Sequence, residues 1–166
     1  MSQTTSTTLK MECRRMTLTP LSDDGVVRGV AVPYNKLSHV ITGESRRGFR
    51  EKFAPGAARV SDDTVLHLQH DQQGVPLGRV GAGTLRFREE PEGLMFEADL
   101  PESRPDVREA IRRGDMAAAS VGFILEENGD SWTHSPSGSV RTVRAARILE
   151  VSIVSSPAYP DAKLES

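Results

Sequence analysis

The sequence predicts a β-rich α+β domain, a closed or nearly closed, mainly antiparallel β-barrel flanked by a few helices. Short apolar runs of β type recur along the chain, separated by turn signals that draw on 14 glycines and 10 prolines. Aromatic residues are scarce, at 5%. The 166 residues suffice for one domain with its own core, without disulfides or a metal. This combination favours a barrel or a sandwich.

Composition narrows the classes of partner. Charge is nearly balanced, with 21 basic and 23 acidic residues, which disfavours nucleic-acid binding. The single cysteine, Cys13, has no partner for an internal disulfide and suits a reducing compartment. No apolar run approaches the roughly 18 residues of a membrane span. We therefore expect a soluble cytosolic protein without a membrane partner.

The first half of the chain reads as strands with one short helix. We expect a disordered tail over residues 1–10, one folded domain over 11–162 and a short tail over 163–166. Strands at 14–18 and 26–32 are predicted to form a hairpin. A polar loop follows, and Pro55 suits the first turn of a short helix over 53–59. The next strand, 64–71, ends at a loop that contains glycine.

The second half contains the clearest helix. Strands are predicted at 77–80, 84–90 and 94–100. Ser103 with Asp106 resembles a capping box, and Gly114 ends the helix that follows. Residues 126–139 are polar and read as an excursion between strands or a disordered loop. Three arginines in 139–147 are typical of a solvated face, and 148–154 is a strongly apolar strand.

Ser120 is the first candidate for chemistry. It lies in a predicted strand in which Ala118, Ser120 and Gly122 share one face, because side chains alternate along a strand. That face has little side chain above the backbone, so a peptide can approach it closely. A lone serine in a strand is more often a tolerated polar residue, so neighbouring groups must decide.

His70 and Glu150 are the other two candidates. His70 stands at the end of a predicted strand, where it is either a satisfied edge histidine or an imidazole aimed into a cleft. His67 and His70 point to opposite faces of a regular strand, which argues against a shared metal ion unless the backbone leaves the strand. Glu150 lies in an apolar strand and needs a partner, either a nearby arginine or a catalytic group.

Together, these residue types suffice for acyl transfer. A serine hydroxyl becomes nucleophilic when a positioned base takes its proton, and a carboxylate orients that base. The Gly-x-Ser-x-Gly signature is absent, since Ala118 stands at its first glycine. The order His, Ser, Glu matches neither chymotrypsin nor subtilisin. Sequence spacing alone does not show that His70, Ser120 and Glu150 meet.

Six short motifs follow one another along the chain. They are Phe53-Ala54-Pro55-Gly56-Ala57, Leu68-Gln69-His70-Asp71, Pro76-Leu77-Gly78, Glu92-Gly93-Leu94, Ala119-Ser120-Val121-Gly122-Phe123 and Leu149-Glu150-Val151-Ser152-Ile153-Val154 with Pro157-Ala158. In order and spacing this series resembles the prohead proteases of tailed bacteriophages, the capsid maturation proteases, over about residues 26–162. Six motifs in series are specific although each alone is weak.

The resemblance implies a fold and a set of site residues. The family is related in fold to the herpesvirus assemblins, which implies a closed β-barrel flanked by helices. The family's histidine falls on His70 and its serine on Ser120. Glu150 matches the third position, with Asp71 as the fallback. The resemblance also implies an oxyanion site near Val121 and Gly122, helped by an arginine such as Arg144 or Arg147.

The implied activity is that of a serine endopeptidase without a cofactor or metal. It would trim scaffold segments and the major capsid protein inside the immature capsid, in the host cytoplasm, and also cleave itself and self-associate. A second hypothesis is a non-catalytic assembly module of the same fold that binds capsid or scaffold proteins. A third, a metal hydrolase using His67 and His70, is disfavoured by strand alternation.

Overall fold

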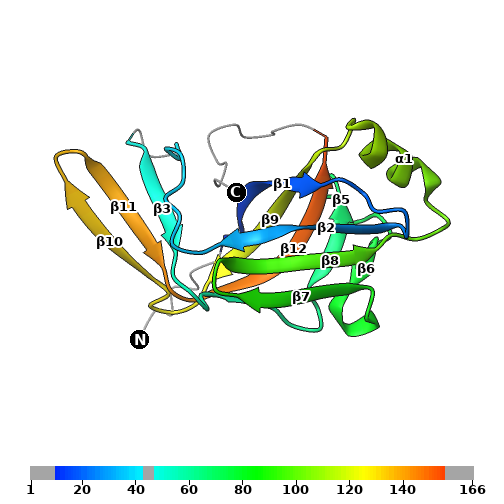
Figure 1. Cartoon of the computed structure of the whole chain (residues 1–166). Coiled ribbons are helices and arrows are strands. Elements are labelled where there is room, and N and C mark those ends of the chain that lie inside the picture. The colour runs from blue at the N-terminus through cyan, green and yellow to red at the C-terminus, as the bar shows by residue number, and fades with distance from the viewer. Residues whose placement is uncertain (1–9, 43–46, 156–166) are drawn as a thin grey trace.

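The computed structural model describes residues 10–42 and 47–155, and its backbone forms two sheets (Figure 1). The larger sheet has nine strands and the smaller has three. The predicted tail over 1–10, except for Lys10, lies outside the described residues, as do the predicted tail over 163–166 and the Pro157-Ala158 motif.

The nine-stranded sheet is mainly antiparallel, as predicted. Its main path runs in the order β6-β5-β12-β9-β1-β2-β8-β7, and β4 pairs with β12 beside that path. β12 pairs in parallel with β4 and β5, so the sheet is mixed. The strands are β1 (Glu12–Thr19), β2 (Val26–Pro33), β4 (Ala58–Arg59), β5 (Val65–Leu68), β6 (Gly78–Arg79), β7 (Leu85–Glu90), β8 (Gly93–Asp99), β9 (Ala118–Leu125) and β12 (Ala146–Val154).

The sheet curls into a nearly closed barrel, which confirms the predicted architecture. Its two end strands, β6 and β7, are consecutive in the chain and are joined by the 3-10 turn η1 (Val80–Ala82). The backbone N–H of Arg79 donates to Thr84 Oγ1 at 2.9 Å across this junction. β6 and β7 remain the two ends of the strand order, so the barrel is nearly closed at this junction and not fully closed.

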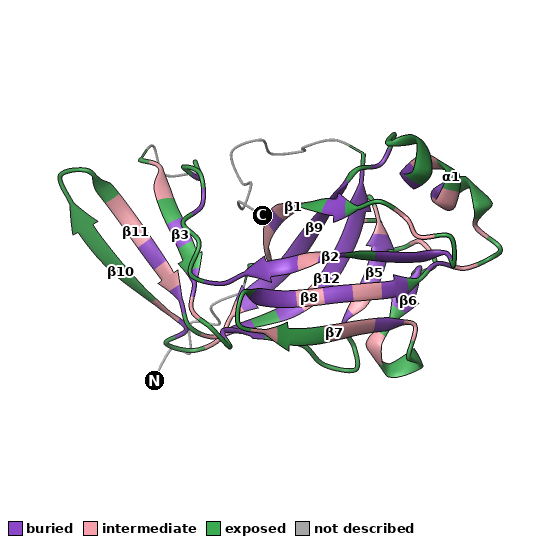
Figure 2. Cartoon of the chain, in the orientation of Figure 1, coloured by how far each residue is buried: buried purple, intermediate pink, exposed green. Residues whose placement is uncertain are grey.

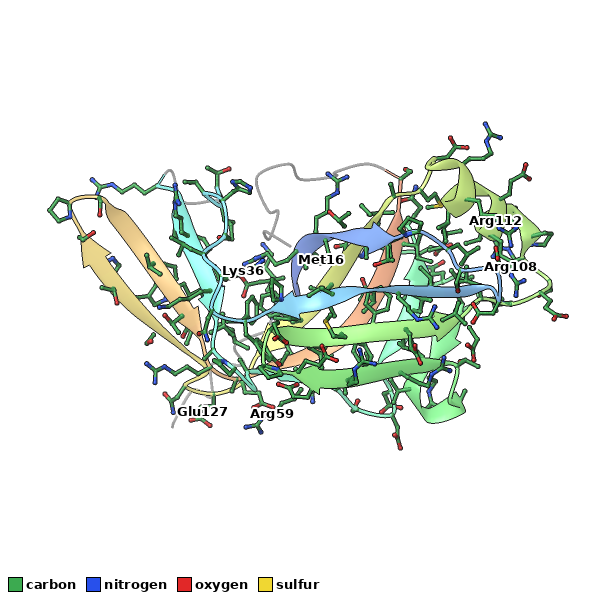
Figure 3. The ribbon with its side chains drawn as sticks, viewed as in Figure 1. Met16, Lys36, Arg59, Arg108, Arg112 and Glu127 are labelled. Carbon is green, nitrogen blue, oxygen red and sulfur yellow. The ribbon has the colours of Figure 1, made fainter. Side chains whose placement is uncertain are left out.

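The core lies inside the barrel, where apolar side chains of alternating strand positions meet. Figure 2 shows β9 and β12 mostly buried, and Met16 of β1, labelled in Figure 3, is 1% exposed. The rings of Phe53 and Phe123 pack edge to face with centroids 5.4 Å apart. In β9, Ala119, Val121 and Phe123 belong to this core, so Ser120 and Gly122 point to the outer face.

The smaller sheet projects from one end of the barrel as an arm (Figure 1). It consists of β3 (Phe49–Phe53), β10 (Asp130–Ser135) and β11 (Gly138–Val143), in the order β10-β11-β3. The polar segment 126–139, expected as an excursion or a disordered loop, thus includes β10 and the turn of the β10–β11 hairpin. β10 is almost wholly exposed, which explains why its sequence has no apolar alternation.

A buried ion cluster joins the arm to the barrel. Arg14 of β1 binds both oxygens of Glu51 of β3, with Nε–Oε1 2.8 Å and Nη2–Oε2 3.0 Å. Arg141 of β11 binds Glu12, Glu51 and Asp130. The prediction that the arginines of 139–147 form a solvated face is therefore wrong for Arg141, because three carboxylates surround it. Two buried cations between carboxylates fix the arm against the barrel.

The structure contains one α-helix among the described residues, α1 (Pro105–Arg113). It ends at Gly114 with φ of 82°, as predicted, but its N-cap is Arg104 without a side-chain hydrogen bond, so the capping box is wrong. The predicted helix over 53–59 is also wrong, because Phe53 ends β3 and residues 58–59 form β4. Figure 3 shows Arg108 and Arg112 on α1, at the far end of the molecule from the arm.

No helix in the described part of the chain is long and apolar enough to cross a membrane.

Candidate active site

Four polar residues line up across the outer face of the main sheet. Arg15 of β1 pairs with Ser120 of β9, Ser120 pairs with Ser152 of β12, and Ser152 pairs in parallel with His67 of β5. Directly paired residues on one face have Cβ atoms roughly 5 Å apart. The register therefore brings residues from four strands into one row, with the candidate serine in the middle.

A bulge in β12 turns Glu150 onto the same face. Ile148 pairs with Phe123 and Glu150 with Gly122, so the extra residue, Leu149, reverses the alternation between them. Ile148 and Val151 both belong to the core, which a regular strand forbids for residues three apart. Glu150 therefore lies two positions from Ser152, which faces Ser120.

His70 reaches this carboxylate because the chain leaves β5 just before it. Gln69 and His70 both adopt positive φ, at 55° and 56°, conformations that cost free energy for residues other than glycine. The Gln69 N–H still donates to Ile153 O at 2.9 Å, so the turn begins directly at the strand end. His70 Nδ1 then lies 2.5 Å from Glu150 Oε1. Two consecutive strained residues at this point are typical of functional sites.

The carboxylate is buried and the imidazole faces outward. Only 3% of the Glu150 side chain is exposed, against 29% of His70. A buried carboxylate has lost its hydrogen bonds to water, and a charge-assisted hydrogen bond from a ring N–H offsets that loss. The proton is therefore favoured on the ring nitrogen nearer to Glu150, which is Nδ1 of His70. Nδ1 thus donates to Glu150, and Nε2 is left to accept a proton.

Ser120 lies beside this pair but is not hydrogen-bonded to it. Within residues 10–42 and 47–155, no hydrogen bond joins Ser120 Oγ to the His70 ring, and Ser120 is 6% exposed. Catalytic hydrogen bonds are often open in the absence of substrate. The arrangement has a hydroxyl, an oriented imidazole and a carboxylate on one sheet face, which are the groups that acyl transfer requires.

Comparison with known families identifies the chain. The model of the caudovirus prohead serine protease family matches residues 10–166. The chain belongs to this family. No curated protein and no solved structure gives a significant match. Membership of the prohead serine proteases makes the chain a serine protease of capsid maturation, with capsid-related substrates and action inside the phage capsid.

Asp71, the fallback for the third site residue in this prohead protease, serves the turn after His70. Its Oδ1 accepts the backbone N–H groups of Gln73 and Gly74, both at 3.0 Å, and the residue is exposed. A carboxylate used in this way stabilises the turn. Glu150, by contrast, contacts the imidazole directly.

The residues predicted for the oxyanion site lie within or beside the sheet. Val121 and Gly122 are in the middle of β9, which pairs with β1 on one side and β12 on the other. Their N–H groups face neighbouring strands, so an oxyanion role for them stays a prediction that requires a sheet hydrogen bond to open. Arg147 pairs with Ile124, four residues or roughly 13 Å along β9 from Ser120.

Four residues surround the serine and the carboxylate that the sequence did not place at this site. Arg15, Ser152, His67 and Cys13 all reach this face from other strands, and Cys13 pairs with Gly122. Burial raises the pKa of the Cys13 thiol, and the charge of Glu150 raises it further. The only signal in the sequence was polar residues alternating within apolar strands, which does not reveal which strands are neighbours.

Two histidines approach Glu150, yet the site has no metal-type cluster. In the described part of the chain, no group of three or more His, Cys, Asp or Glu side chains is placed to hold a metal ion. The backbone leaves the strand after Leu68, between the two histidines, so the premise of regular alternation used against a shared site for His67 and His70 does not hold here.

Proposed function

We propose that the chain is a serine endopeptidase with Ser120 as nucleophile, His70 as general base and acid, and Glu150 as the residue that orients His70. Ser120 Oγ attacks the carbonyl carbon of the scissile bond, and its proton passes to His70 Nε2. The tetrahedral intermediate then breaks its C–N bond, and His70 gives the proton to the leaving amine. Water activated by His70 hydrolyses the acyl-enzyme and frees Ser120.

The observation that carries the proposal is the contact of His70 Nδ1 with Glu150 Oε1 at 2.5 Å, on the face that also bears Ser120. This contact fixes the tautomer that leaves Nε2 unprotonated, which is the role of the acid in a serine protease triad. Family membership supports serine protease chemistry independently of this geometry.

The negatively charged oxygen of the tetrahedral intermediate needs a hydrogen-bond donor or a positive charge close to Ser120. The backbone N–H groups of Val121 and Gly122 are the proposed donors. Arg15 adds a guanidinium on the strand directly opposite Ser120, with a half-buried side chain. Positive charge placed where negative charge develops lowers the barrier to attack.

The proposed substrates are the scaffold segment and the major capsid protein of the phage that encodes the chain, together with the chain itself. Cleavage takes place inside the prohead, in the host cytoplasm, and needs no cofactor. Capsid maturation proteases act on capsid-related proteins, which supports this class of substrate.

The test is co-expression of the chain with the capsid and scaffold proteins encoded beside it, followed by intact-mass analysis. Wild type, Ser120→Ala and the control Ser131→Ala are compared. Ser131 is exposed on β10, away from the site. We expect wild type and Ser131→Ala to shorten the partner proteins, while Ser120→Ala leaves them intact and keeps its fold.

Two outcomes contradict the proposal. Cleavage by clean Ser120→Ala protein excludes this serine as the nucleophile. If wild type, Ser120→Ala and Ser131→Ala all fail to cut the partner proteins and all still enter the particle, the chain is a non-catalytic assembly module that binds capsid or scaffold proteins.

A further inference from the structure

Glu150 has a second imidazole on its other oxygen. His67 Nε2 lies 3.8 Å from Glu150 Oε2, while His70 Nδ1 lies 2.5 Å from Oε1. The His67 side chain is 9% exposed, so it faces the carboxylate from inside the protein. One buried carboxylate thus lies between two histidines of different exposure.

Two atoms next to this contact are buried without a partner. In the described part of the chain, His67 Nδ1 and Ser152 Oγ have no hydrogen bond. Leaving a buried polar atom unpaired is costly, so two of them on neighbouring strands call for an explanation. They belong to residues paired directly across β5 and β12. A hydroxyl donates and an unprotonated ring nitrogen accepts, so the two atoms are a complementary donor and acceptor.

We propose that Ser152 and His67 form a positioning pair that holds the Glu150 carboxylate in line with His70. Ser152 O–H donates to His67 Nδ1, His67 Nε2–H donates to Glu150 Oε2, and His70 Nδ1–H donates to Glu150 Oε1. The inference rests on the proposed function of His70 and Glu150. His67 is neutral in this chain of hydrogen bonds and transfers no proton.

The physical reason is rotation of the carboxylate. A glutamate held by one oxygen turns about its last torsion angle, which is broad. Holding the second oxygen restricts that turn and keeps the first oxygen aimed at His70. The 3.8 Å separation between His67 Nε2 and Glu150 Oε2 exceeds a hydrogen bond, so the proposed pair requires a small rotation of the ring or of the carboxylate.

Two other polar groups lie near Glu150, and neither is placed like His67 to donate a hydrogen bond to Oε2. Cys13, on β1, approaches from the opposite side and is a thiol with a raised pKa, so it is a weak donor. Arg15 lies on β1 opposite Ser120, two positions from Cys13.

The first test is spectroscopic and independent of activity. Histidine ring nitrogens are labelled with 15N in the Ser120→Ala protein, and the tautomers are read at neutral pH. We expect His67 as a neutral ring with the proton on Nε2 and a bare Nδ1. Ser152→Ala should leave His67 as a mixture of tautomers. A His67 ring that is protonated on Nδ1, or is already a mixture with Ser152 present, overturns the proposal.

The second test is kinetic, on the capsid or scaffold protein that the wild type shortens. His67→Gln is expected to lower kcat about tenfold to a hundredfold with little change in KM, the range carried by a hydrogen bond to a charged group. Ser152→Ala should lower kcat by a smaller factor than His67→Gln does. His134→Gln, the control at an exposed histidine of β10, should leave kcat unchanged. Unchanged kcat in His67→Gln contradicts the proposal. A loss equal to that of His70→Gln makes His67 a base, which also contradicts it.

The two proposals fail separately. If wild type cleaves nothing, or Ser120→Ala cleaves as wild type does, the proposed function is wrong, while the tautomer of His67 still tests the hydrogen-bond chain. If Ser120 and His70 prove essential and His67 has the wrong tautomer, only the positioning pair is wrong.

Discussion

Gly122 lies directly beneath the carboxylate of Glu150. A Cβ at this position would stand 2.9 Å from Glu150 Cγ and 2.9 Å from Met11 Sδ, closer than side chains tolerate. A larger residue here would force the side chain of Glu150 or Met11 to shift, so glycine suits the close approach of a side chain from the next strand. The bulge in β12 creates this close approach, because it places Glu150 opposite Gly122.

Gly122→Ala is expected to push Glu150 away from His70. We predict that kcat/KM falls at least tenfold, because a carboxylate that no longer contacts Nδ1 does not fix the tautomer. The free energy of unfolding should fall by about 1–3 kcal/mol, the usual cost of overpacking. Cleavage of the co-expressed capsid protein and urea denaturation measure the two effects.

Gly29→Ala in β2 is the matched control for this change. Its added Cβ would stand 2.7 Å from Phe96 Cε1, so it brings a similar clash in the same sheet. Gly29→Ala should lose stability and keep its activity per folded molecule. Full activity in Gly122→Ala, or equal loss in both variants, would show that Gly122 has no special relation to the site.

An ion cluster joins β1 of the barrel to the three strands of the arm, which are far from β1 in the chain. Its members are Glu12, Arg14, Glu51, Asp130 and Arg141. Glu51 is fully buried and binds both arginines. Burial raises the pKa of the Glu12 carboxyl, but the hydrogen bonds and charges of Arg141 and Arg14 outweigh this and lower it. A carboxyl whose pKa is lowered by folding stabilises the protein above its unfolded pKa. That stability is lost as pH falls through the lowered value.

Glu51→Gln is predicted to destabilise the protein by about 3–5 kcal/mol, because it leaves buried arginine charge without its main partner. The urea midpoint measures this effect. Asp99→Asn is the control, since it breaks the exposed Arg86–Asp99 pair and should cost about 1 kcal/mol or less. A loss in Glu51→Gln no larger than in Asp99→Asn would mean that the buried cluster adds nothing beyond a surface pair.

At the scale of the whole molecule, the arm and the barrel should unfold together. The chain has a single tryptophan, Trp132, and it lies on β10 of the arm, edge to face with Phe49 at 5.0 Å. Arg141 lies 5.8 Å from the centroid of its ring, and the same guanidinium enters the ion cluster with the barrel strand β1. Tryptophan fluorescence therefore reports on the arm, while far-UV circular dichroism reports on all strands.

In wild type we expect the fluorescence and circular dichroism transitions in urea to coincide, as one cooperative unit requires. In Glu51→Gln the fluorescence transition should move to lower urea than the circular dichroism transition, because the contact between arm and barrel is weakened first. Asp99→Asn should keep the two transitions together. Separate transitions in wild type would show that the arm is an independent unit.

Local patterns in the sequence determined most of the strands and the faces of the key residues. Alternation placed Ser120 and Gly122 on one face of β9, and the glycine after 105–113 ended the helix where the structure ends it. The motifs also predicted the family and the barrel. These features depend on residues close together in the chain, so periodicity and turn chemistry report them directly.

Only the tertiary structure decided which strands are neighbours and where the chain departs from regular geometry. The row from Arg15 to His67 depends on pairings across four strands, and the contact of His70 with Glu150 joins residues 80 positions apart. The strained turn at His70 brings its imidazole to the carboxylate that His67 also faces, which regular alternation does not predict. The bulge at Leu149 lets Ile148 and Val151 both enter the core. Such contacts are non-local, and the sequence pattern of one strand contains no record of its partner's register.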